Sequence, residues 1–141
     1  MATGDNSGPF SWSPAFPFMY GLSYTTFDVA PLNVSLSGST ITASVRVTNT
    51  GARPAKQVVG VFFSKPLSSF VRNHLSLLAF AKTGELAPGG AELLQMDAPV
   101  ASLGSFDPAA GASVVEKGVY DITVRTDAAT VVENGGFTIT I

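Results

Sequence analysis

Ten carboxylates, one histidine and many hydroxyl groups are the side chains of this 141-residue chain that could take part in catalysis. General acid–base hydrolysis needs two such groups within reach of one bound substrate. Almost all of the acidic residues fall in predicted turns or on solvent-facing strand positions, as Asp107, Glu116 and Asp121 do. We therefore expect them to be solvated or to cap turns, and we expect no catalytic residue in this chain.

Metal binding and nucleophilic catalysis have equally little support. His74 is the only histidine, it has no acidic cluster nearby, and the chain contains no cysteine. Zinc sites need several nitrogen or sulfur ligands, and a catalytic triad needs a positioned histidine. We expect no metal, no cofactor and no disulfide.

The composition excludes several other classes of protein. Hydrophobic residues make up 45% of the chain and charged residues 13%, which is typical of one folded domain rather than a disordered chain. The net charge of −2 has interspersed signs, so nucleic acid is not an expected partner. No apolar run approaches the roughly 18 residues of a membrane span, and residues 1–10 lack the features of a signal peptide.

Short β-strands are the elements that must position the candidate side chains of this chain. Apolar and polar residues alternate with period two from Phe27 onward, most cleanly over 41–48, and helical periodicity of useful length is absent. Pro31 indicates an irregularity in the first strand. The expected strands are 27–36, 41–48, 57–64, 75–85, 91–97, 103–106, 119–126 and a last one that Gly135 and Gly136 open. This pattern predicts an all-β, Ig/fibronectin type III-like Greek-key sandwich of about seven strands.

The strand at 57–64 is apolar on both of its faces. Val59 and Val61 can face a core, which leaves Val58 and Phe62 on the opposite side. A sandwich strand needs only one buried face. The second face is therefore expected to be covered by a loop, another chain or a neighbouring domain.

Aromatic residues gather where the chain enters this domain. Residues 1–17 are rich in glycine, proline and serine and are interpreted as a linker or extended arm, followed by the domain at 18–141. Clustered aromatics outside the sheets must bury against something, because large exposed apolar patches are unfavourable. We expect docking onto a larger body, with packing into the domain's own core as the alternative. The candidate docking residues are Phe16, Phe18, Tyr20, Tyr24, Phe27 and Phe62.

Two further aromatic residues suggest separate roles. Trp12, the only tryptophan, is a candidate for stacking on a sugar ring, although packing of the linker is the stronger expectation. Tyr120 lies at the start of the strand at 119–126, where sandwich domains often have a tyrosine that hydrogen-bonds back to the preceding loop. We therefore predict a tyrosine corner at Tyr120.

Several blocks of the chain, in order, resemble one known family. The first is 16–27, FPFMYGLSYTTF, and the others are 47–51, 58–64, 78–83, 86–89, 105–107 and 118–122. Together they resemble the fibronectin type III-like domain of family 3 glycoside hydrolases, the β-glucosidases and β-xylosidases. One departure is Met19, which stands where that family usually has glycine.

The resemblance implies a non-catalytic accessory module that packs against the catalytic domains of a β-glucosidase-like enzyme. No catalytic residue of that family maps onto this chain. Localisation stays open, since the parent enzyme could be cytoplasmic, periplasmic or secreted. The alternative is an autonomous polysaccharide-binding sandwich. If the chain is an accessory module instead, we expect at most weak contact with polysaccharide. Self-association through the docking residues is a further hypothesis.

Overall fold

The computed structural model describes residues 15–70 and 73–141, which form nine strands and one short 3₁₀ helix. Trp12 and the first part of the predicted arm lie outside the described residues. The elements are β1 (Phe27–Ser37), β2 (Thr40–Asn49), β3 (Val58–Ser64), β4 (Ser76–Lys82), β5 (Ala91–Pro99), η1 (Val100–Leu103), β6 (Ser105–Asp107), β7 (Ala112–Val114), β8 (Val119–Arg125) and β9 (Val131–Thr140).

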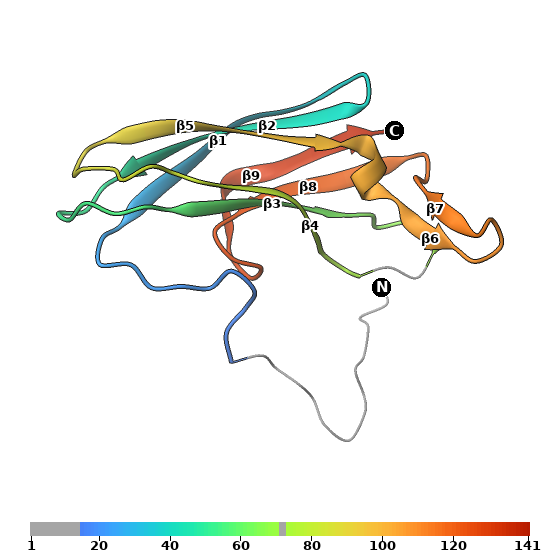
Figure 1. Ribbon diagram of the computed structural model, residues 1–141, viewed down its shortest axis with the longest axis horizontal. Helices are drawn as coiled ribbons and strands as arrows, with labels where there is room; N and C mark the ends of the chain where they lie inside the picture. The colour runs from blue at the N-terminus through green and yellow to red at the C-terminus, as the bar shows by residue number, and fades with distance from the viewer. Residues whose placement is uncertain (1–14, 71–72) are drawn as a thin grey trace.

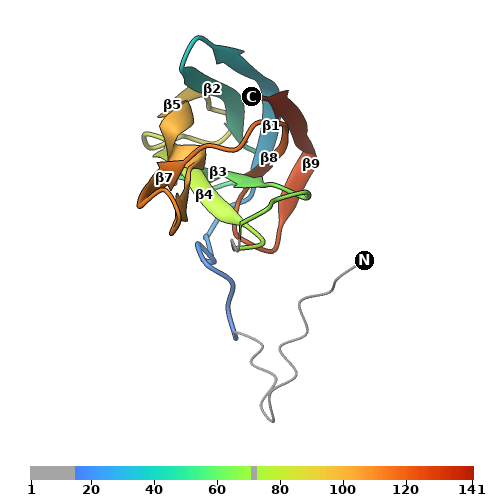
Figure 2. The same cartoon turned by 90° about the vertical axis from the view of Figure 1, so that its right-hand side faces the viewer.

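Two antiparallel sheets face each other, which confirms the predicted sandwich (Figures 1 and 2). One sheet has the order β1-β2-β5 and the other the order β4-β3-β8-β9. These two sheets contain seven strands. The remaining two, β6 and β7, pair with each other as a separate small hairpin at one end of the sandwich.

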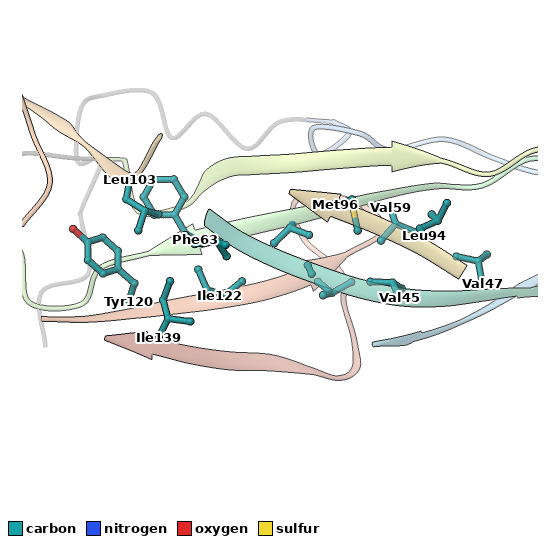
Figure 3. Packing of buried hydrophobic residues seen from close by; sticks show 14 of the residues in the cluster. Val45, Val47, Val59, Phe63, Leu94, Met96, Leu103, Tyr120, Ile122 and Ile139 are labelled. Carbon is teal, nitrogen blue, oxygen red and sulfur yellow. The ribbon is translucent and has the colours of Figure 1, made fainter. Parts of the chain in front are cut away.

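The core lies between the two sheets and follows from the alternation of the central strands. Val45 and Val47 of β2 are fully buried, and they point towards Val59 of β3 (Figure 3). At the other end of the core, the rings of Phe63 and Tyr120 lie 6.3 Å apart between centroids. One buried face per strand is what a period-two pattern produces in a sandwich.

The first strand has the irregularity that its proline predicted. The register between β1 and β2 shifts between Pro31 and Asn33. Proline has no amide hydrogen for the ladder and is therefore tolerated at an edge or a bulge. Leu32, the residue left over at this shift, is largely exposed.

The last strand was predicted to start too late. It begins at Val131, and Gly135 and Gly136 lie within it. Asn134 has a positive φ of 55°, and the register between β8 and β9 shifts between Thr123 and Arg125. Glycines inside a strand often mark a bulge, so they were misinterpreted as the turn that opens it.

The alternation predicted for residues 75–85 also fails at one point. Leu77 is exposed, whereas Leu78 packs against the core on the same side as Ala79 and Ala81, so strict alternation does not hold through this strand. The register between β3 and β4 shifts between Val61 and Phe62, where Val61 pairs with Ala79 and Phe62 with Leu77. The extra residue changes which side chains face inward beyond that point.

Residues 103–106 form two kinds of structure rather than the one strand expected. Leu103 ends the 3₁₀ helix and is fully buried, and β6 starts only at Ser105. No helix in the described part of the chain is long and apolar enough to cross a membrane.

Candidate docking surface

The arm, defined from here on as residues 15–26, runs below the sandwich before it enters β1 (Figure 1). Its first part turns tightly, since the amide of Tyr20 donates to the carbonyl of Pro17 at 3.0 Å. It is tied to the loop after β8, because the amide of Ala128 donates to the carbonyl of Phe18 at 2.8 Å. The arm is therefore part of the folded domain at this point.

Met19 occupies the turn in a backbone conformation that favours glycine. Its φ is 68°, in the left-handed region that side chains other than glycine rarely adopt. Glycine, the residue that the resemblance leads us to expect at this position, would adopt this conformation without strain. The side chain of Met19 lies over Gly60 of β3, where an added Cβ would be 3.0 Å from the Met19 sulfur. The missing side chain at Gly60 thus makes room for the thioether.

The arm covers the second apolar face of β3. Phe62 is only 3% exposed, although it points away from the core between the sheets. The ring of Phe18 meets it edge-on, with centroids 6.5 Å apart and planes at 82°. The Arg125 guanidinium lies 6.0 Å from the centre of the same ring. The cover that the sequence required is therefore supplied, at Phe62, by this chain itself.

Above these contacts, the arm presents aromatic side chains to solvent. Phe16 stacks on Tyr20, with centroids 5.0 Å apart and planes at 27°. Phe18 contacts Phe62 through one edge and is still 62% exposed. Phe80 of β4 pairs with Gly60, so it shares the outer sheet face with Met19, and it is exposed as well. We call Phe16, Phe18, Tyr20 and Phe80 the aromatic ridge.

A second attachment holds the arm where it joins β1. The amides of Thr50 and Gly51 both donate to the carbonyl of Thr26, at 2.9 and 3.3 Å. A Cβ at Gly51 would lie 2.7 Å from the Thr26 amide nitrogen, so the close approach depends on glycine. This contact joins residues that are far apart in the chain, so no pattern within residues 49–54 predicts it.

Asn49 organises the second attachment from a fully buried position. Its Nδ2 donates to the carbonyls of Arg53 and Leu86, both at 2.8 Å. Its Oδ1 accepts from the Thr25 hydroxyl at 2.8 Å and from the Gly51 amide at 3.1 Å. A buried amide of this kind must have every group paired. In the sequence, the one signal for Asn49 was its place in the block 47–51, which is part of the resemblance to the fibronectin type III-like domain.

Between the two attachments, the arm stands clear of the domain. Leu22 is 90% exposed and Tyr24 is 95% exposed. No ring contact joins Tyr24 to another aromatic within residues 15–70 and 73–141. Large exposed apolar side chains often mark an interaction site, so binding to another surface would explain why this segment exposes them.

Two of the predicted docking residues are not available on this surface. Phe27 is half-buried and packs against the core between the sheets. Phe62 is buried beneath the arm, as described above. Packing into the domain, the alternative in the sequence analysis, applies to these two residues, while Phe16, Phe18, Tyr20 and Tyr24 are exposed.

The opposite end of β8 has the geometry of a tyrosine corner. Tyr120 is fully buried, and its hydroxyl donates to the carbonyl of Glu116, four residues upstream, at 2.8 Å. Lys65 lies over the ring at 4.4 Å from the centroid. The Glu116 carboxylate accepts from the hydroxyls of Ser68 and Ser69 and so holds the loop after β3.

Two aspartates elsewhere cap turns, and one of them is Asp107, for which this role was expected. Asp107 accepts from the amide of Ala109, and Asp127 accepts from those of Ala129 and Thr130. No group of three or more potential metal ligands occurs in the described residues. The arrangement offers an aromatic surface for contact rather than a set of groups for acid–base chemistry.

Comparisons with known proteins agree with this architecture. A β-glucosidase of Rhizobium radiobacter is 33% identical over 118 residues, 82% of this chain and 14% of that protein. The structure of β-glucosidase 3B from Thermotoga neapolitana superposes with a TM-score of 0.83 at 37% identity, covering 91% of this chain and 17% of that chain. The β-glucosidase of Kluyveromyces marxianus gives a TM-score of 0.85 at 31% identity, covering 92% and 15%.

These similarities concern one segment of much longer proteins. The chain spans 14–16% of the length of the curated relatives that it matches. The fibronectin type III-like domain is the family whose pattern matches, over residues 57–128 and so just over half of the chain. With two facing antiparallel sheets and this match, the chain belongs to the fibronectin type III-like domain family.

Proposed function

We propose that this chain is a non-catalytic accessory module of a larger β-glucosidase-like glycoside hydrolase and packs against the catalytic domains of that enzyme. The relatives support the proposal, because in each of them the matching segment is a small part of a β-glucosidase. The aromatic ridge is the observation that carries it. Interfaces between domains of one chain bury apolar and aromatic surface of this kind.

The ridge is suited to docking because the domain itself holds it in place. Met19 packs over Gly60, Phe18 meets Phe62, and the Ala128 amide holds the backbone of Phe18. Side chains fixed before association lose less conformational entropy when a partner covers them. The partner is the rest of the parent polypeptide, since the relatives have about 85% of their length outside this segment.

The proposal is tested by comparing the module alone with the module joined to its parent polypeptide. We expect the double variant Phe16→Ser, Tyr20→Ser to leave the unfolding midpoint of the isolated module within a few degrees. In the joined protein the same change should lower the midpoint of the catalytic domains and separate one cooperative calorimetric transition into two. Phe106→Ser is the matched control, because Phe106 is about as exposed as Phe16 but lies on β6, away from the ridge.

Two outcomes would count against docking. The first is an unchanged calorimetric profile of the joined protein with the ridge variant. The second is saturable binding of the isolated module to soluble or insoluble glucans or xylans that Tyr20→Ala abolishes. That result would instead favour the autonomous polysaccharide-binding module, the alternative that the sequence left open.

Self-association of the isolated module follows from the same surface. A ridge evolved for burial stays exposed when the parent domains are absent, and a second copy can cover it. We expect a concentration-dependent dimer in sedimentation experiments that Phe16→Ser, Tyr20→Ser weakens at least tenfold. A strictly monomeric module at millimolar concentration would contradict this expectation.

A further inference from the structure

Methionine is the only oxidisable sulfur residue in this chain. The chain has three methionines and no cysteine. Met96 lies in the core and is 4% exposed, and Met1 lies outside the described residues. Met19 is half-exposed, so it is the described methionine that a small oxidant in solution can reach.

The Met19 sulfur sits at a point on which the first attachment of the arm depends. A Cβ added at Gly60 would lie 3.0 Å from its Sδ and 3.1 Å from its Cε. Phe62 flanks the same space, since its Cε2 would lie 2.8 Å from that Cβ. Met19 also lines a solvent-open hollow of about 190 Å³, together with Tyr20, Gly21, Gln57, Val58, Thr126 and Asp127. The thioether is thus packed on one side and accessible beside the hollow.

We propose that Met19 is an oxidation site whose conversion to the sulfoxide releases the first part of the arm from the sheet. The oxidant is a peroxide such as H2O2. Its O–O bond breaks, one oxygen bonds to Sδ, the thioether is oxidised to a sulfoxide, and the peroxide is reduced to water. No proton is gained or lost by the protein, and methionine sulfoxide reductases reverse the change.

The physical effect follows from what holds Met19 in place. A sulfoxide places a polar S–O group against Gly60 and the Phe62 ring, where the unmodified thioether makes apolar contacts. The backbone of Met19 is already in a left-handed conformation, with φ 68°, which only the surrounding contacts stabilise. One backbone hydrogen bond, from Ala128 to Phe18, joins the described arm to the loop after β8.

Release would uncover Phe62 and disperse the aromatic ridge. The consequence for docking rests on the proposed function, whereas the oxidation and the release concern the module alone. The second attachment, at Asn49 and Gly51, contains no sulfur and is unaffected. Oxidation should therefore change one end of the arm and leave the other in place.

The oxidation itself is tested by treating the folded module with H2O2 and locating added oxygen by tandem mass spectrometry. We expect Met19 to react at least tenfold faster than Met96. In urea-unfolded protein the two rates should become equal, which controls for intrinsic reactivity. Equal rates in the folded module would overturn the proposal.

Release of the arm is tested by amide hydrogen exchange. The Ala128 amide reports on the first attachment and the Thr50 amide, which donates to Thr26, on the second. After oxidation we expect Ala128 to exchange at least tenfold faster and Thr50 to be unchanged, with reversal by methionine sulfoxide reductase.

Two variants separate the role of Met19 from general damage. Met19→Leu keeps an apolar side chain over Gly60, so its Ala128 exchange should not respond to H2O2. Met96→Leu should respond as the unmodified sequence does. Oxidation of Met19 without faster exchange at Ala128 would overturn the release. That result would leave the docking proposal intact, because docking is tested separately, with the ridge variants in the unoxidised protein.

Discussion

The two attachments of the arm differ in the forces that hold them. At Thr25 and Thr26, hydrogen bonds to Asn49, Thr50 and Gly51 fix the chain around a fully buried amide. At Phe18 and Met19, the chain is held by ring and thioether packing with one backbone hydrogen bond to Ala128. Hydrogen bonds are directional and costly to leave unmade when buried, whereas exposed apolar packing is weaker and adaptable.

This difference divides the arm into a structural part and an adjustable part. The polar attachment belongs to the stability of the sandwich, because Asn49 also holds the carbonyls of Arg53 and Leu86. The apolar attachment presents the aromatic ridge and carries the oxidisable Met19. Parts of a structure with few buried contacts open locally at a smaller cost in free energy, so the apolar attachment is the one that a local change can release.

The largest effect is expected at the centre of the polar attachment. Asn49→Leu removes four hydrogen bonds at once, those to the carbonyls of Arg53 and Leu86 and those from the Thr25 hydroxyl and the Gly51 amide. We expect a loss of more than about 3 kcal/mol in the free energy of unfolding, measured by urea denaturation. Asn33→Ala, at an exposed position of β1, is the control and should change stability by less than about 0.5 kcal/mol.

Gly51→Ala should be the next most severe change. Its Cβ would lie 2.7 Å from the backbone nitrogen of Thr26, which cannot move without losing its attachment. Overpacking of this kind costs about 2–3 kcal/mol, again by urea denaturation. Gly136→Ala has no atom within 4 Å of the new Cβ and should be nearly neutral. A neutral Gly51→Ala would mean that the polar attachment is not the rigid one.

A smaller effect is expected from the equivalent change at the apolar attachment. Gly60→Ala places a Cβ 3.0 Å from Met19 Sδ and 2.8 Å from the Phe62 ring. Both neighbours are side chains that can shift, so the loss should be about 1 kcal/mol. Exchange of the Ala128 amide should accelerate in this variant while that of Thr50 does not. The reverse pattern of exchange would contradict the assignment of the two attachments. Gly21→Ala, in open space, is the control.

The smallest effect is expected between the attachments. Leu22→Ser and Tyr24→Ser replace side chains that are almost fully exposed, so each should change stability by less than about 0.5 kcal/mol in thermal or urea unfolding. A loss above about 1 kcal/mol from either variant would show that this segment packs on the domain. If the docking proposal holds, the same variants should weaken coupling to the parent domains.

Much of the sandwich could be predicted from residue patterns alone. The alternation at 41–48 gave β2, Pro31 gave the irregularity in β1, and the position of Tyr120 indicated its hydrogen bond to the preceding loop. Errors occurred where the register shifts, at Leu77 and Leu78 and at the start of β9. A bulge depends on the neighbouring strand, so alternation within one strand does not reveal it.

The candidate site was predictable in part. The aromatic segment and the two apolar faces of 57–64 indicated that something must cover Phe62. The sequence did not show that the chain's own arm supplies this cover. Nor did it distinguish Phe18, which is exposed, from Phe27, which packs on the core.

The sequence by itself determined the class of fold, the absence of cysteine chemistry and the places where aromatic side chains gather, because composition and period-two alternation follow from local residue types. Tertiary structure decided which of those aromatics remain exposed, why Met19 can occupy a glycine conformation, and why Asn49 is buried with all of its groups paired. These properties result from the contact of Gly60 with the arm and from the hydrogen bonds of Asn49 with three separate segments. They depend on contacts between residues far apart in the chain, which no local pattern encodes.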